Sequence, residues 1–165
     1  MITFAGRRAA TAVAVLTLAC ARREPASVEV RNPEYLVVRS IRREPDAEHT
    51  TRVALPYSGA GFGFAAATPL LDLRSVDAAG ATFAGGRTSL AGEATIWVPL
   101  TAEGNRRLAE WSRAHAGDFL GIYLDGRLVA APGIRGAIGG GIPLRVASKG
   151  EGDAVLRRLH AGGAP

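Results

Sequence analysis

Apolar and polar positions form short blocks along the second half of the chain, and each block fits one element. Apolar runs of about four to eight residues with β-branched or aromatic side chains are typical of strands, and apolar positions three or four apart are typical of helices. From Ala94 onward these rules predict a strand, a helix, three strands and a second helix. We expect the strands at 94–100, 119–124, 127–131 and 142–147, and the helices at 101–116 and 150–160.

The stretch Leu120–Pro132 carries the clearest local signal. Its two apolar runs, Leu120–Leu124 and Leu128–Ala131, flank Asp125-Gly126. A type I′ turn needs positive φ at both central residues, and Asp and Gly accept that conformation. Pro132 ends the second strand because it has no N–H to donate to a neighbour. The sequence therefore predicts an antiparallel hairpin with Asp125 and Gly126 at its turn.

Both predicted helices have start signals. Thr101 can cap the first helix, and Glu103 lies in its first turn, where the helix dipole favours an acid. Ser148 and Glu151 have the spacing of a capping box before the second helix. Gly117 follows the first helix and is typical of a helix end.

The first half of the chain has weaker patterns. Tyr35–Arg43, Thr51–Tyr57 and Pro69–Val76 are interpreted as strands, the first two as a possible hairpin with a long charged loop. Between them, Ser58–Ala67 has glycines at 59, 61 and 63 but no capped helix after them, and the chain has no Gly-Lys-Ser/Thr sequence. We interpret Ser58–Ala67 as a flexible loop rather than a phosphate-binding loop.

The order of elements from Ala94 indicates an α+β fold. We expect two helices packed on one face of an antiparallel or mixed sheet, in a split-βαβ, ferredoxin-like plan. The strand 142–147 should pair with one of the hairpin strands. The strand 94–100 would then be an edge strand, since Pro99 is typical of an edge or a strand end.

The N-terminus resembles an export signal. Residues 1–20 contain Arg7-Arg8, an apolar run too short to span a bilayer as a permanent helix, and the ending Thr17-Leu18-Ala19-Cys20. This ending resembles a bacterial lipobox, in which the cysteine is acylated. An ordinary signal peptide with a chance cysteine is the alternative. The domain prediction is a leader at 1–20, a tether at 21–34, a β-rich base at 35–93 and a second unit at 94–165.

The composition disfavours some classes of partner and site. The chain has 20 basic and 15 acidic residues, and its net charge of +5 includes the leader arginines. The arginines are scattered, without a basic stripe that interleaves with aromatic residues, which disfavours nucleic-acid binding. The single cysteine excludes an internal disulfide and a cysteine metal site.

No familiar catalytic motif is present. The three histidines lie in a predicted loop and at two helix ends, without H-E-x-x-H, G-x-S-x-G or a cysteine–histidine set. Asp125 is explained by its turn. Asp72 and Asp77 are isolated carboxylates, and the loop containing Asp46 and His49 is interpreted as solvated. We therefore expect no enzyme, no cofactor and no metal, with an unrecognised site as the open alternative.

The stretch from Trp97 to Pro165 resembles the head subdomain of the periplasmic first domain of SecD, an export factor. Four pieces carry the likeness in order. They are V-P-L-T-A-E-G-N-R-R-L from Val98, the hairpin L-G-I-Y-L-D-G-R-L-V-A-A-P from Leu120, I-G-G-G before 142–146, and the closing stretch from Ala154 through G-G-A-P. Within this pattern Leu124, Asp125, Gly126, Pro132 and Gly140 are expected to be structural. SecD's membrane helices have no counterpart here, so its proton-coupled work is not implied.

The resemblance implies a fold and a place outside the cytoplasm. We expect a protein anchored through Cys20 to the bacterial envelope membrane, facing the periplasm or the cell exterior. Its partner would be an extended or unfolded polypeptide or another envelope protein. Two docking places are predicted: an open edge of the strand 94–100, and the apolar loop Gly133–Gly141 with Ile134 and Ile138. An envelope enzyme or enzyme regulator, with a cavity that gathers Asp72, Asp77 or His49, is the alternative.

Overall fold

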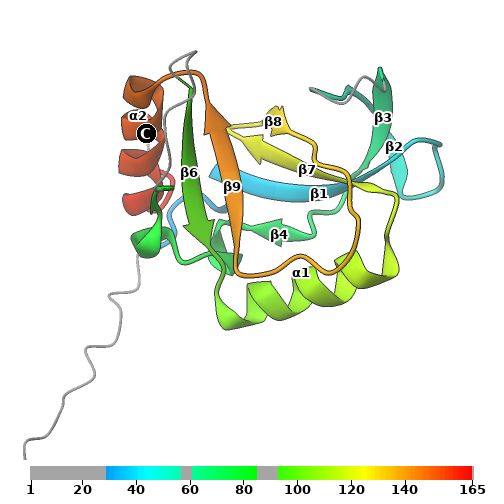
Figure 1. The fold of residues 1–165 in the computed structure, drawn as a ribbon, viewed down its shortest axis with the longest axis horizontal. Helices are drawn as coiled ribbons and strands as arrows, with labels where there is room; N and C mark the ends of the chain where they lie inside the picture. The colour runs from blue at the N-terminus through cyan, green and yellow to red at the C-terminus, as the bar shows by residue number, and fades with distance from the viewer. Residues whose placement is uncertain (1–28, 57–60, 85–92, 165) are drawn as a thin grey trace, which may run out of the picture.

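The strands of the computed structural model form two antiparallel sheets (Figure 1), and the structure describes residues 29–56, 61–84 and 93–164. The larger sheet has the order β2-β3-β1-β7-β8, and β4 also pairs with β1. Its strands are β1 (Leu36–Arg42), β2 (His49–Ala54), β3 (Phe62–Ala66), β4 (Leu71–Asp72), β7 (Phe119–Leu124) and β8 (Arg127–Ala130). The smaller sheet has the order β5-β6-β9, with β5 (Thr82–Phe83), β6 (Ala94–Pro99) and β9 (Gly141–Val146).

Within the described residues, two α-helices accompany the sheets. The first, α1 (Ala102–Ala114), runs below β1 and β4 in the view of Figure 1, and α2 (Lys149–His160) packs against β6 and β9. The Thr101 side chain caps α1 by accepting the Gly104 N–H, and Ser148 caps α2 by accepting the Glu151 N–H. Short 3₁₀ turns lie at η1 (Pro33–Tyr35), η2 (Leu73–Ser75) and η3 (Ala78–Gly80).

The predicted α+β class is confirmed, with antiparallel strand pairs throughout. The strands divide between two sheets rather than forming one, because β9 pairs with β6 and not with the β7–β8 hairpin. The inner faces of both sheets, α1 and α2 contribute to one main core. Its fully buried members include Leu36, Val38, Ile96, Val98, Leu108, Ile122 and Leu159.

A second, smaller core lies on the opposite face of β1. It consists of Ile41, Leu55, Ala65, Phe119 and Ala131, and we call these five residues the second core. The alternation of β1 explains the separation, since residues two apart face the same side of a sheet. Val38 thus faces the main core, while Ile41 faces the second core.

The structure corrects the expected pairing of the first strands. The end of the predicted flexible loop Ser58–Ala67 is strand β3, which inserts between β1 and β2, so β1 and β2 do not form a hairpin. The glycines there allow close packing: a Cβ at Gly63 would overlap the Ile41 side chain and the Arg42 carbonyl. Pro69–Val76 forms only the two-residue β4, followed by η2, because Asp72 caps that turn.

The expected tether at 21–34 is shorter on its C-terminal side, since residues 29–34 lie against the domain. Val30 packs on the main core, and the backbone N–H groups of Arg31 and Asn32 both donate to the Gly162 carbonyl, at 2.9 and 3.0 Å. Gly162 and Gly163 have φ of 68° and 81°, and a Cβ on Gly162 would overlap the Glu29 carbonyl. The two glycines therefore join the beginning and the end of the domain.

Candidate functional site

The β7–β8 turn has the geometry that its sequence predicts. Asp125 and Gly126 have φ of 51° and 75°, both positive, as a type I′ turn requires. The Asp125 N–H donates to the Tyr35 carbonyl at 2.9 Å, and its exposed carboxylate forms an ion pair with Arg158 at 3.0 Å. Turn geometry and this ion pair account for Asp125, and its exposure is unlike that of a catalytic acid.

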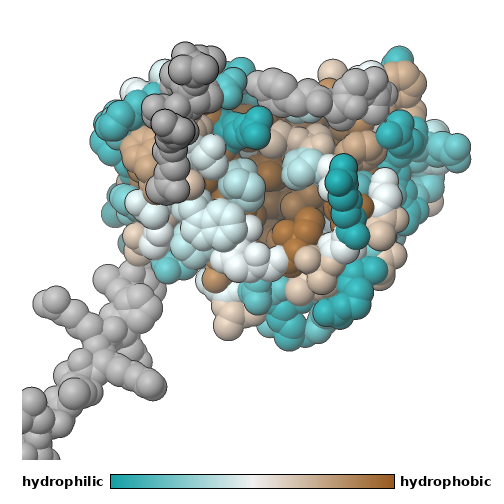
Figure 2. All heavy atoms as spheres, in the orientation of Figure 1, coloured by the Kyte–Doolittle hydropathy of each residue, from teal (hydrophilic) through white to brown (hydrophobic). Residues whose placement is uncertain are grey.

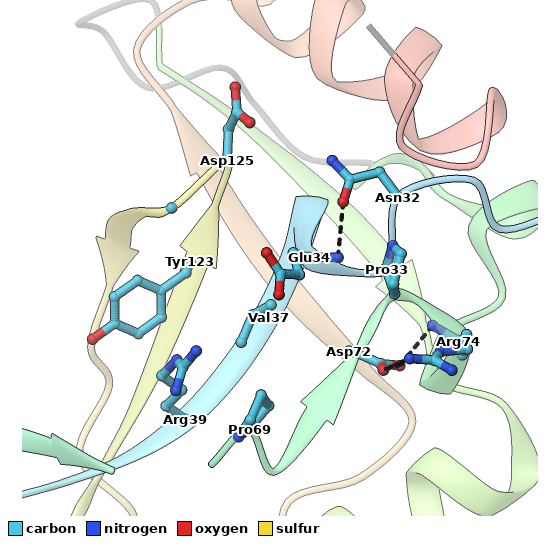
Figure 3. A pocket seen from close by; sticks show the side chains of 11 residues that line it. Asn32, Pro33, Glu34, Val37, Arg39, Pro69, Asp72, Arg74, Tyr123 and Asp125 are labelled. Atoms are coloured by element: carbon cyan, nitrogen blue, oxygen red, sulfur yellow. Dashed lines mark hydrogen bonds and ion pairs between the residues drawn. The ribbon is translucent and has the colours of Figure 1, made fainter. Parts of the chain in front are cut away.

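A cavity of about 500 Å³ lies next to this turn, between β1, β4 and β7. Figure 3 shows its side chains, with Arg39 and Tyr123 side by side on neighbouring strands. Its two arginines have partners inside the protein: Arg39 donates to the Ala66 and Ala67 carbonyls, and Arg74 pairs with Asp72. Burial raises the pKa of Tyr123, whose hydroxyl has no hydrogen-bond partner among the described residues. Because both arginines are already paired, this cavity is a poor candidate for an anionic ligand.

The loop Gly133–Gly141 does not present the apolar surface that the sequence predicts. Ile134 is only 3% exposed and belongs to the main core, so its expected exposure is wrong. Its backbone is fixed as well: the Ile134 N–H donates to the Asp118 carbonyl at 2.8 Å. Ile138 is half-buried against the core, and its N–H donates to the Ser112 hydroxyl at 2.8 Å. A docking surface here needs other residues.

Gly140, in the same loop, has a structural role. Its φ is 85°, its N–H donates to the Asn105 side-chain oxygen at 2.6 Å, and its carbonyl accepts from Leu100. The loop is therefore tied to α1 and to the end of β6.

An apolar groove of about 370 Å³ lies between β8 and β9, the facing edges of the two sheets. Small and ring-shaped side chains line it together with one cation, namely Pro56, Ala130, Ala131, Pro132, Gly133, Pro143 and Arg145. Figure 2 looks onto this side of the molecule and shows a hollow with apolar side chains at its centre. This concave surface thus includes Pro132, where the predicted hairpin ends, and Gly133, where the loop Gly133–Gly141 begins.

The open edges differ from the expected one. β6 is the central strand of the smaller sheet, paired with β5 on one side and β9 on the other, so the predicted edge at 94–100 is wrong. Pro99 fits there because it is the last residue of the strand. In the part of the chain that the structure describes, β8 and β9 are edge strands, and each borders the groove.

The isolated acids serve local structure. Asp72 accepts the Arg74 N–H at 2.9 Å and begins η2, and Asp77 accepts the Gly80 N–H at 3.1 Å and begins η3. Within residues 29–56, 61–84 and 93–164, no group of three or more His, Cys, Asp or Glu side chains could hold a metal ion.

His49 is the one candidate that the structure groups with other reactive side chains. It is 4% exposed, and its ring lies between the Ser40 hydroxyl and the Asp46 carboxylate. The sequence pattern predicts a strand at Ser40 and a solvated loop at Asp46 and His49, and it does not bring the three residues together. The alternation of β1, which turns Ser40 inward beside Val38, was the available signal.

The predicted lipidation residue, Cys20, lies outside the described residues. Among the described residues, no helix is long and apolar enough to cross a membrane. The anchor therefore stays a prediction from sequence.

Comparison with protein-family models gives a match over just more than half of the chain. The family model described as "SecDF, P1 head subdomain" matches residues 65–150, which is more than half of the chain. No curated protein matched the chain.

Two solved structures share the fold. One is a membrane component, SecDF, that enhances protein export, with a TM-score of 0.56 and 24% identity over 79% of this chain. The other is SecDF in a super-membrane-facing form, with a TM-score of 0.56 and 25% identity over 79% of this chain. The aligned part makes up 63% and 19% of those two chains, respectively.

Proposed function

Because the chain belongs to the SecDF P1 head subdomain family, we propose that it is an envelope accessory protein that binds extended segments of exported polypeptides. The binding site is the groove between β8 and β9. The protein holds the segment and carries out no chemistry on it there. The SecDF structure that shares this fold is described as enhancing protein export, which supports a partner in the same process.

The observation that carries this proposal is the pair of strand edges facing one apolar groove. An edge strand has unpaired N–H and C=O groups, and an extended chain can bind them by strand addition. The lining alanine, proline and glycine residues are small or ring-shaped, so the groove can accept large apolar side chains of an unfolded segment. A folded protein has buried such side chains already, which gives the groove its preference for unfolded chains.

We propose in addition that Cys20 is acylated and that the domain, from residue 29 onward, faces the periplasm or cell exterior. The run T-L-A-C and the short apolar stretch before it support this anchor. Cys20→Ser should release the protein from membranes into the soluble fraction. Unchanged membrane fractionation of Cys20→Ser would refute the anchor without bearing on the groove.

Photo-crosslinking tests the groove. A photoreactive amino acid at Arg145, which lines the groove, should trap newly exported polypeptides in cells. The same amino acid at Arg113, an exposed position on α1, is the control and should trap far less. Equal trapping at both positions would show that contact is not specific to the groove.

Filling the groove is the second test. Gly133 lines the groove, and a Cβ there would make only ordinary contacts with Phe119, so Gly133→Leu should fold and fill the space. Gly136 lies in the same loop with open space around it, and Gly136→Leu is the matched control. Trapping at Arg145 should fall with Gly133→Leu and persist with Gly136→Leu. Persistent trapping in both variants contradicts the proposed site.

A further inference from the structure

Ser40, His49 and Asp46 form a hydrogen-bonded chain. The Ser40 Oγ lies 2.5 Å from His49 Nε2, and His49 Nδ1 lies 2.8 Å from Asp46 Oδ1. Ser40 comes from the central strand β1, His49 begins β2, and Asp46 lies in the connection between β1 and β2. Each nitrogen of the imidazole thus faces a different partner, a hydroxyl on one side and a carboxylate on the other.

The carboxylate fixes which nitrogen carries the proton. An ionised Asp46 can only accept hydrogen bonds, so His49 Nδ1 donates to it, and Nε2 is left to accept the Ser40 O–H. Asp46 also accepts the backbone N–H groups of Glu48 and His49, each at 2.8 Å, and pairs with Arg42 at 2.8 Å. The hydrogen bonds from His49, together with these contacts, hold the pKa of Asp46 well below its usual range. Asp46 therefore stays charged at neutral pH and orients the ring.

The serine borders a cavity. Ser40 is 9% exposed and lines a space of about 470 Å³ between β1, the turn Ala66–Leu70 and α1. This volume lies within the range of small-molecule sites. Arg107 of α1 and Thr68 line the same cavity, and Arg107 is its cationic side chain.

We propose that Ser40, His49 and Asp46 form a hydrolytic site for small carboxylic esters. His49 Nε2 removes the proton from Ser40 as the Oγ bonds to the ester carbonyl carbon, and the same proton passes to the departing alcohol as its C–O bond breaks. Water then attacks the acyl-serine, and its proton passes through His49 back to the serine Oγ as the carboxylic acid leaves. Arg107 lines the same cavity and is the cation there that can stabilise the negative charge developing on the carbonyl oxygen, while Glu48 is the acid among the lining residues.

This activity is separate from polypeptide binding. The cavity at Ser40 and the groove between β8 and β9 share no lining residue, so either site can operate without the other. The competing interpretation is a hydrogen-bonded link that only fastens the β1–β2 connection to the sheet. A fastening role needs the same distances but gives Ser40 no reactivity, and that difference is measurable.

The test uses the full chain and a fluorophosphonate, a reagent that loses fluoride when an activated serine attacks its phosphorus atom. Mass spectrometry of the digested protein should find the label at Ser40. p-Nitrophenyl acetate should be hydrolysed by the wild type and not by Ser40→Ala. The remote cap variant Ser148→Ala is the matched serine control and should keep both labelling and hydrolysis.

The histidine variant separates activation from mere exposure of the serine. His49→Gln should slow labelling and hydrolysis by about 10²–10⁴-fold, the usual contribution of a general base. If this variant unfolds, the wild-type pH profile serves instead, since labelling of an activated Ser40 must follow an ionisation. A folded wild type without label at Ser40, a pH-independent labelling rate, or equal rates in a folded His49→Gln would each overturn the proposal.

Discussion

The larger sheet contains the antiparallel hairpins β7–β8 and β2–β3, and different interactions determine the structure of each. β7 pairs with β1 along its whole length, and the connection of β7 and β8 is a two-residue turn with both φ angles positive. β2–β3 lies at the far end of the sheet in Figure 1, pairs with β1 only through Ile41 and Arg42, and leaves Phe62 43% exposed. The first hairpin is specified by its turn, whereas the second depends on what it packs against.

The second core connects the two hairpins. Ile41 lies on β1 between them, and its side chain fills the space beside Gly63 of β3 and Gly121 of β7. The glycines are needed because a Cβ at either position would overlap this isoleucine. Packing around Ile41 thus helps to fix a hairpin that has no strong local turn signal, together with the hydrogen bond between Ser40 and His49.

Removing that side chain should have the largest effect. Ile41→Ala creates a cavity at a site with 0% exposure, so we expect a loss of about 2–5 kcal/mol in the free energy of unfolding. Urea unfolding measures this loss. Amide hydrogen exchange should show that β2 and β3 lose more protection than β7. Val129→Ala, on the partly buried β8, is the control with a smaller expected loss.

A variant of the β7–β8 turn tests the hairpin that depends on its turn. Gly126→Val places a β-branched residue at φ of 75°, and we expect a loss of about 1–2 kcal/mol or more, since bulky residues avoid that region. Gly136→Val, where a Cβ meets open space, is the control and should lie near the wild type in urea unfolding. Equal losses in the two variants would contradict the role of the turn.

The β1–β2 connection should be sensitive to acid. The pKa of Asp46 is lowered in the folded state by its hydrogen bonds from His49 and Glu48, so its stabilisation is complete above the unfolded value of about 3.9 and is lost as pH falls below it. Thermal unfolding should show wild type and Asp46→Asn differing at neutral pH and converging in acid. Asp153→Asn removes a surface ion pair with Lys149 and should show little difference at any pH.

The exposed aromatic residue of β3 should matter least to stability. Phe62 packs edge-on against Phe64 and under the Arg52 guanidinium, but 43% of it faces solvent. Phe62→Ala should change the free energy of unfolding by less than about 1 kcal/mol in urea. A loss as large as that of Ile41→Ala would mean that β2–β3 is held from its outer face instead.

The elements with local signals were predictable. Thr101 and Ser148 begin the helices because their side chains accept backbone N–H groups, and Asp125-Gly126 turns because of its φ preference. The division of the strands into two sheets was not predictable. β9 pairs with β6 rather than with the β7–β8 hairpin, and this choice depends on contacts between residues distant in the sequence. The burial of Ile134 and the internal place of β6 were missed for the same reason.

The same difference between local signals and long-range contacts applies to the candidate sites. The sequence could point to the loop Gly133–Gly141 after Pro132 as a docking surface. The groove, however, exists only because the two sheets meet there. Ser40 and His49 are nine positions apart, and only the insertion of β3 and the return of β2 place the ring beside the hydroxyl. Spacing along the chain could not show that contact.

The joint between residues 29–32 and Gly162-Gly163 has a mechanical consequence. Any pull that reaches the domain through its N-terminal segment passes first to the Gly162 carbonyl and then to β1, which lies between β3 and β7. β1 pairs with β7 on one side, and with β4 through Val37 and Val38 and β3 through Ile41 and Arg42 on the other, so a load on β1 would act on hydrogen bonds on both of its sides. A load applied through residues 29–32 would therefore meet a strand that is paired on both sides rather than a free edge.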